Sequence, residues 1–118
     1  MERFDSSDLG DYRGDTYLLV GFVEPDPHEY DEFDPAEDAV NYGWTLVQKA
    51  ESPLDENVEI ARMDTRHGQP HLDKEYLPRG TNEERKIFLE DGYSFERMRD
   101  YLLENWQKFA DLHIHYNE

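Results

Sequence analysis

The segment SFERMRDYLLENWQKFADLHIHY, residues 94–116, contains one continuous pattern that decides the class of fold. Its members recur at steps of three and four residues, which places them on one face of an α-helix. They are Phe95, Met98, Leu102, Trp106, Phe109 and His113. Ser94 is a favourable N-cap, and Glu96 in the first turn complements the helix dipole. A helix of about 20 residues with one apolar face has to cover another layer, which must come from the preceding chain.

The preceding chain has the composition of a β-sheet. Residues 16–23 and 42–49 are short segments rich in β-branched and aromatic residues, and residues 58–64 alternate between apolar and polar side chains. Residues 71–77 predict an edge strand, while residues 84–90 fit either a last short strand or a helical turn. The fold class is therefore predicted to be α+β: an antiparallel meander of four to five strands with the long C-terminal helix packed on one face.

The other segments are predicted to be irregular parts of a single domain, residues 1–118. Residues 1–15 are polar and contain two glycines, which favours a flexible arm. Residues 24–38 contain three prolines, eight acidic residues and no basic one, which indicates an acidic loop with one helical turn near residues 35–40. No apolar run of about 18 residues predicts a membrane span, and no secretory signal pattern is visible, so we expect a cytoplasmic protein.

The charge of the chain is strongly negative, with 29 acidic and 12 basic residues and a formal net charge of −17. This charge disfavours nonspecific binding of duplex nucleic acid, because the phosphates would repel it. Abundant carboxylates with few lysines favour a halophilic protein, since concentrated salt shortens the Debye length to roughly 3 Å and screens self-repulsion.

The excess of acidic residues is unevenly distributed along the chain: residues 1–38 hold 13 acids and two bases, whereas residues 62–99 hold eight of each. The balanced region leaves room for one anion-binding face.

The balanced region contains the segment RMDTRHGQPHLDK, residues 62–74, which concentrates residues that carry chemistry. It holds two histidines, two aspartates, two arginines and one lysine around a turn set by Gly68 and Pro70, so these side chains are expected at the rim of a loop. The chain has no cysteine, which excludes disulfides, thiolate metal sites and cysteine nucleophiles. Three interpretations of the segment compete.

The first interpretation is general acid–base catalysis on a phosphodiester, with no cofactor. His67 and His71 would act as the base and the acid, because histidine titrates near neutral pH. Asp64 would orient one imidazole ring. Three positively charged side chains would neutralise the developing charge on the phosphate: Arg62, Arg66 and Lys74. A metal-independent ribonuclease needs a general base, a general acid and positive charges that bind the phosphate.

The second interpretation is a metal site formed by His67, His71 and Asp73, whose nitrogen and oxygen donors suit zinc, manganese or nickel. The two histidines have the spacing H-x-x-x-H, which is favourable on a helix, but Gly68 and Pro70 disfavour a helix here. The third interpretation is structural, because a polar turn whose histidines pair with nearby acids needs no ligand or substrate.

Residues 42–110 resemble the TumE-like toxin components of prokaryotic toxin–antitoxin pairs, which are small α+β proteins. The shared features are a strand ending in Arg-x-Asp, a histidine-containing turn and an aromatic-rich helix. The matching residues are Arg62, Asp64, His67, His71, Phe95, Leu102, Trp106 and Phe109. The resemblance implies a growth-inhibiting activity directed at RNA and a partner antitoxin protein. Members of that family place a further histidine where this chain has Asp73, and this departure favours the metal or structural interpretation.

Two classes of function stand beside an RNA-cleaving toxin. One is a non-catalytic interaction domain whose helix or edge strand pairs with a second copy, as a homodimer, or with another protein. The other is the metal-binding domain of the second interpretation. We expect no membrane partner in any of these cases.

Overall fold

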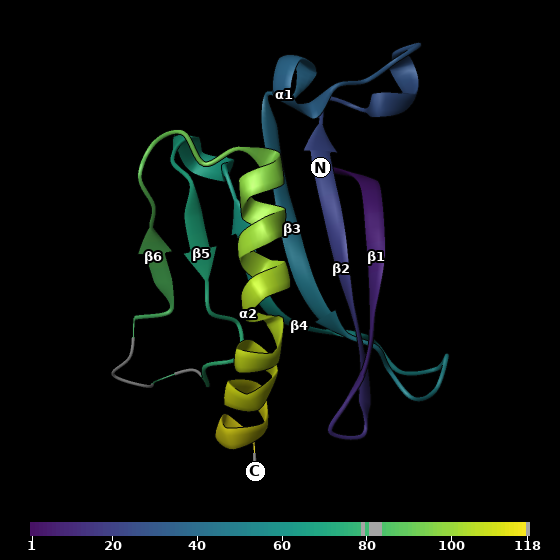
Figure 1. Cartoon of the computed structure of the whole chain (residues 1–118), viewed down its shortest axis with the longest axis vertical. Helices are drawn as coiled ribbons and strands as arrows, with labels where there is room; N and C mark the ends of the chain where they lie inside the picture. Colours follow the sequence, from purple (N-terminus) through teal and green to yellow (C-terminus); the bar gives the residue numbers. More distant parts are fainter. Residues whose placement is uncertain (79, 81–83, 118) are drawn as a thin grey trace.

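The computed structural model of the chain describes residues 1–78, 80 and 84–117, apart from the side chain of His67. In this part of the chain, six strands form one antiparallel sheet whose spatial order is the chain order. The strands are β1 (Glu2–Tyr12), β2 (Asp15–Glu24), β3 (Asn41–Gln48), β4 (Val58–Asp64), β5 (His71–Asp73) and β6 (Lys86–Phe88). The helices are η1 (Pro27–Glu29), α1 (Pro35–Asp38), η2 (Arg66–Gly68) and α2 (Phe95–Tyr116). Helix α2 lies across the central strands (Figure 1), which confirms the predicted α+β class.

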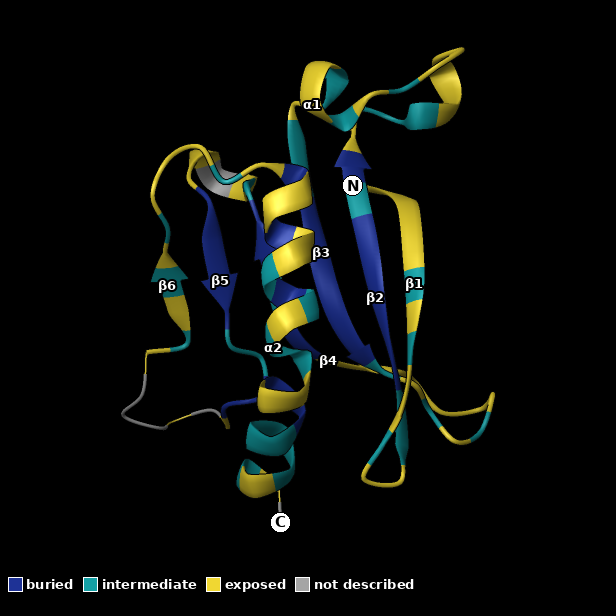
Figure 2. Cartoon of the chain, in the orientation of Figure 1, coloured by how far each residue is buried: buried dark blue, intermediate teal, exposed yellow. Residues whose placement is uncertain are grey.

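The hydrophobic core lies between α2 and one face of the sheet. Met98 and Leu102 of α2 have no exposed surface, and they belong to the same buried cluster as Trp44 and Leu46 of β3. Burying a side chain of this size contributes about 1.5–3 kcal/mol. Figure 2 shows the consequence: β2 to β5 are largely buried, whereas β1, β6 and the outer side of α2 are mostly exposed. The periodicity of the helix therefore places the core correctly.

The beginning of α2 follows its sequence signal. The hydroxyl of Ser94 accepts a hydrogen bond of 3.0 Å from the backbone N–H of Arg97, so the predicted N-cap is confirmed. The indole N–H of Trp44 donates to the backbone carbonyl of Phe95 at 2.9 Å. A β-carbon on Gly21 would lie 2.8 Å from the Trp44 ring, so only glycine lets that ring lie against β2. These contacts fix the start of the helix over β2 and β3.

The prediction of a flexible arm over residues 1–15 is wrong. Glu2–Tyr12 form the edge strand β1, which pairs with β2 along its length. The polar composition of β1 hides it, because an edge strand is held by main-chain hydrogen bonds and most of its side chains face solvent. Two register shifts, between Arg3 and Asp5 and between Asp8 and Gly10, also break the alternation by which strands are detected.

Among the described residues the sheet has six strands, one more than the four to five predicted. Its second edge strand also differs from the one predicted in residues 71–77. Residues 71–77 were expected to contain an edge strand, but β5 covers only His71–Asp73 and pairs on its outer side with β6. The ambiguous segment 84–90 thus supplies the second edge of the sheet as Lys86–Phe88. Three residues are too few for a periodicity to identify a strand.

The acidic segment 24–38 has local structure of its own. It contains η1 and α1, and the latter confirms the helical turn expected there. Asp34 caps α1, since its carboxylate accepts from the backbone N–H of Ala36 at 3.0 Å. Phe33 packs on Phe4 of β1 with ring centroids 5.5 Å apart, so the segment is anchored to the sheet. No helix in the described part of the chain is long and apolar enough to cross a membrane.

A candidate cation site on the open face of the sheet

The candidate site lies on the face of the sheet opposite α2, which we call the open face. Met63 of β4 and Leu72 of β5 belong to the core cluster under the helix. Because successive side chains of a strand point to opposite faces, the neighbours of these two residues project to the open face. Those neighbours are Arg62, Asp64, His71 and Asp73. All four belong to the segment 62–74 singled out from the sequence.

The antiparallel register brings these side chains together. Asp64 stands directly opposite His71, and Arg62 stands opposite Asp73. On the other side of β4, Gly43 of β3 is paired with Asp64, and a β-carbon there would collide with the side chain of Asp64. The glycine therefore provides the space in which the Asp64 carboxylate turns toward β5.

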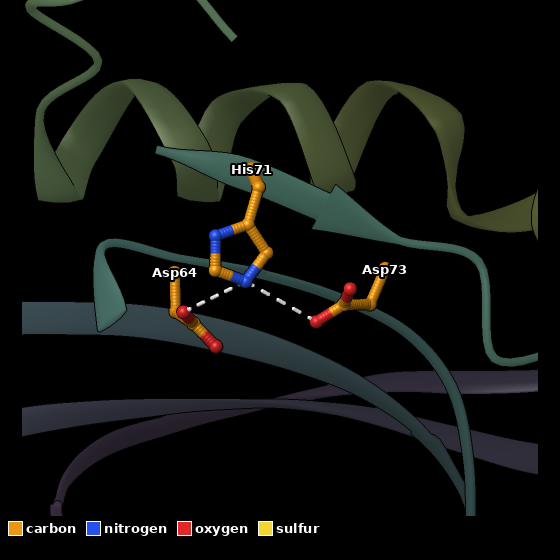
Figure 3. Close-up of side chains that lie close together, drawn as sticks. All are labelled: Asp64, His71 and Asp73. Atoms are coloured by element: carbon orange, nitrogen blue, oxygen red, sulfur yellow. Dashed lines mark ion pairs between the residues drawn. The ribbon is translucent and has the colours of Figure 1, made fainter. Parts of the chain in front are cut away.

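The centre of the cluster is the Nε2 atom of His71. It lies 3.1 Å from Oδ1 of Asp64 and 3.3 Å from Oδ2 of Asp73 (Figure 3). The other ring nitrogen, Nδ1, lies 3.0 Å from the backbone carbonyl oxygen of Gln69. A carbonyl only accepts hydrogen bonds, so this contact assigns a proton to Nδ1. Nε2 then faces two carboxylate oxygens, an arrangement that favours a positive species between them.

The carboxylate oxygens are also held by basic residues. Oδ2 of Asp64 lies 3.1 Å from Nε of Arg62, and Oδ1 of Asp73 lies 3.8 Å from Nζ of Lys86. These are the oxygens that do not face His71. The inner oxygens accept hydrogen bonds: Oδ1 of Asp64 accepts from the backbone N–H of Arg66 at 2.9 Å, and Oδ2 of Asp73 accepts from Nη2 of Arg62 at 3.4 Å. Each carboxylate is thus oriented with one oxygen toward the centre.

Burial makes the charges in this cluster costly to leave uncompensated. Asp64 is 1 % exposed, His71 2 % and Asp73 7 %. Burial alone would lower the pKa of Arg62, but the carboxylates of Asp64, Glu59 and Asp73 outweigh it and raise that pKa above its ordinary value, so Arg62 stays charged. Nε of Arg62 is close to Asp64 without being aligned for a hydrogen bond, so this contact is electrostatic.

The predicted site residues are brought together only in part. Arg66 is exposed and contributes its backbone N–H, while Lys74 follows β5 and donates its backbone N–H to the carbonyl of Arg85. The side chain of His67 lies outside the described residues. Catalysis by His67 and His71 stays a prediction, and in this arrangement both nitrogens of His71 already have partners.

Sequence reasoning missed two contributors to the site. Lys86 stands opposite Asp73 across β5 and β6, and Glu59 lies 3.7 Å from Nη1 of Arg62. Lys86 could have been found only if residues 84–90 had been assigned to a strand. Among the described residues, Asp64, His71 and Asp73 form the cluster whose donor atoms all lie within 4.8 Å of one another. Asp64, which the predicted ligand set did not include, thus joins His71 and Asp73, which it did.

Comparison with known proteins places this site inside a family segment. The family described as "Domain of unknown function (DUF7718)" matches residues 31–117, which contain β3 to β6 and α2. No curated protein and no solved structure matches the chain.

Proposed function

The chain belongs to the DUF7718 family of domains of unknown function, and we propose that it is a metal-binding domain. Its protein ligands are Asp64, His71 and Asp73, and the ion is a divalent transition metal such as zinc or manganese. The observation that carries the proposal is the position of Nε2 of His71 between two buried carboxylate oxygens, while Nδ1 is engaged by a backbone carbonyl.

The separations of the donor atoms support this proposal. Bonds of about 2.0–2.2 Å from a metal to nitrogen or oxygen place neighbouring ligand atoms roughly 3.0–3.5 Å apart in tetrahedral or octahedral geometry. Nε2 of His71 lies 3.1 and 3.3 Å from the two carboxylate oxygens, and all three donor atoms lie within 4.8 Å of one another, so movement of the Asp64 and Asp73 side chains would complete the ligand geometry. Three protein ligands leave the remaining coordination positions to water.

The surroundings of the ligands resemble the outer shell of a metal site. A metal-bound histidine usually donates its other N–H to a carbonyl or carboxylate, which fixes the tautomer, and Gln69 provides that carbonyl. The outer oxygens of the carboxylates are held by Arg62 and Lys86, which orients the inner oxygens.

The experiment is a titration of chelator-treated protein with zinc and, separately, with manganese, followed by calorimetry and thermal unfolding. We expect one ion per chain and a rise in melting temperature, because an ion at about one hundred times its Kd stabilises the folded state by about 2.7 kcal/mol. Asp64→Asn and Asp73→Asn should each weaken binding at least about tenfold, since each replaces a charged ligand with a neutral one of similar shape.

The matched controls are surface residues of the same types. Asp8→Asn removes an exposed carboxylate of β1, and His28→Gln removes an exposed histidine that pairs with Asp26 at 2.9 Å. Neither substitution should change the affinity. Equal stabilisation of the Asp64→Asn variant and the wild type by the metal, or no stabilisation of either, would show that Asp64, His71 and Asp73 form a structural network and not a metal site.

A further inference from the structure

A second site lies on the helix-covered side of the sheet, away from the metal ligands. It is a cavity of about 300 Å³ between the start of β1, α1 and the first turn of α2, which we call the α1–α2 pocket. Its floor is apolar and aromatic, formed by Phe4, Trp44 and Phe95. The size suits one long side chain or a small ligand.

The floor of the pocket is built by the irregularity of β1. Phe4 falls at the register shift between Arg3 and Asp5, and it contacts Phe95 with ring centroids 5.9 Å apart in an edge-to-face arrangement. Phe95 in turn packs on Trp44 at 4.7 Å. Phe33 of segment 24–38 also packs on Phe4, with ring centroids 5.5 Å apart, and Phe4 still keeps 37 % of its surface exposed. A partly exposed aromatic ring therefore forms part of the pocket lining.

The rim of the pocket is acidic. Among the described residues that line it, Asp5, Asp34 and Glu96 are acidic and Arg99 is basic, which leaves two net negative charges. Asp34 belongs to the segment 24–38, which holds eight acids and no base. The N-terminal end of α2 carries a partial positive charge, and Glu96 in its first turn offsets it. The potential at the mouth thus favours a cation.

We propose that the α1–α2 pocket binds an arginine side chain from a basic segment of a partner protein. A guanidinium group is planar and stacks on aromatic faces, which Phe4 offers, while the aliphatic stem of arginine packs on apolar surface. Asp5, Asp34 and Glu96 supply the opposite charge, and the net charge of −17 attracts a basic partner over longer range. This site is independent of the metal ligands.

The test must separate the pocket from general attraction between an acidic protein and any polycation. A fluorescently labelled arginine hexapeptide is titrated with the full chain, and binding is followed by polarisation. Glu96→Gln should weaken binding at least about threefold, as expected for loss of a contacting charge. The control is Glu104→Gln, which removes the same charge from an exposed position further along α2 and should leave affinity nearly unchanged.

Two further variants report on the chemistry of the pocket. Phe4→Ala should weaken binding, whereas Phe88→Ala, which removes an exposed ring on β6, should not. Arg99→Ala should tighten binding, because it removes a like charge from the rim. Equal effects of Glu96→Gln and Glu104→Gln would show that only the overall charge attracts the peptide. Weaker binding by the Arg99→Ala variant would show that the peptide is not repelled by Arg99, so its guanidinium does not occupy the pocket. Either result overturns the proposal.

Discussion

His113 shows how burial of a single side chain links stability to pH. It lies half-buried near the end of α2, and its Nδ1 atom is 3.2 Å from the side-chain nitrogen of Asn117. Burial lowers the pKa of His113 from its ordinary value of 6.5, and the charge of Asp15 offsets only part of that effect. The unfolded chain therefore binds this proton more readily than the folded chain. The stabilisation is present above pH 6.5 and is lost as the pH falls toward the lower folded-state pKa.

The variant His113→Gln removes this titration and keeps a polar side chain that can still accept from Asn117. We expect its free energy of unfolding to fall less than that of the wild type between about pH 7.5 and pH 5.5. Urea titrations at both pH values, read by circular dichroism, measure the difference. Parallel losses in the two proteins would mean that His113 takes no part in the acid sensitivity.

The residues of the candidate site could be named from the sequence, but their partners could not. Arg62, Asp64, His71 and Asp73 all fall in a segment whose composition indicates chemistry. Which of them meet depends on the register of β4 and β5, which pairs Asp64 with His71. Register is set by three-dimensional pairing and by the shape of the turn, and neither can be read from residue types in one chain.

At the scale of the element, α2 is stabilised by its buried face rather than by its intrinsic propensity. Leu102 is fully buried, whereas its neighbour Leu103 is only half-buried. Leu102→Ala should lower the free energy of unfolding by about 2–5 kcal/mol, because it removes buried apolar surface and leaves a cavity. Leu103→Ala, the matched control, should cost about 1 kcal/mol or less. Urea titration compares them, and equal losses would contradict the placement of the helix.

The helices and strands could be predicted from the sequence where the hydrophobic pattern was long or where one face of the element was buried. Helix α2 shows six positions of a stripe, and the bounds of β4 agree with the predicted strand 58–64. β1 was missed because its side chains are polar and its register shifts twice, and β6 was ambiguous because it has three residues. Both are edge strands, so their positions depend on pairing with β2 and β5 more than on their own composition.

At the scale of the whole molecule, the negative charge is concentrated at one end of the sheet order. Residues 1–38 carry 13 of the 29 acids and include β1, β2 and the acidic segment. Here folding works partly against charge repulsion, since Glu2 and Asp5 lie at the end of β1 that approaches segment 24–38. The region around the candidate site is balanced, so its buried carboxylates have basic partners close at hand.

This distribution predicts a dependence of stability on salt. Raising potassium chloride from about 0.1 M to 1 M shortens the Debye length from about 10 Å to about 3 Å, so the free energy of unfolding should increase as repulsion is screened. Replacing the exposed acids in Asp31→Asn and Glu32→Gln should reduce that increase, whereas Asp91→Asn and Glu90→Gln, an exposed acidic pair in the balanced region, should reduce it less. Thermal unfolding by circular dichroism at both salt concentrations measures the effect. A melting temperature that does not change with salt would remove the argument for a halophilic protein, because repulsion would then contribute little to the stability of the fold.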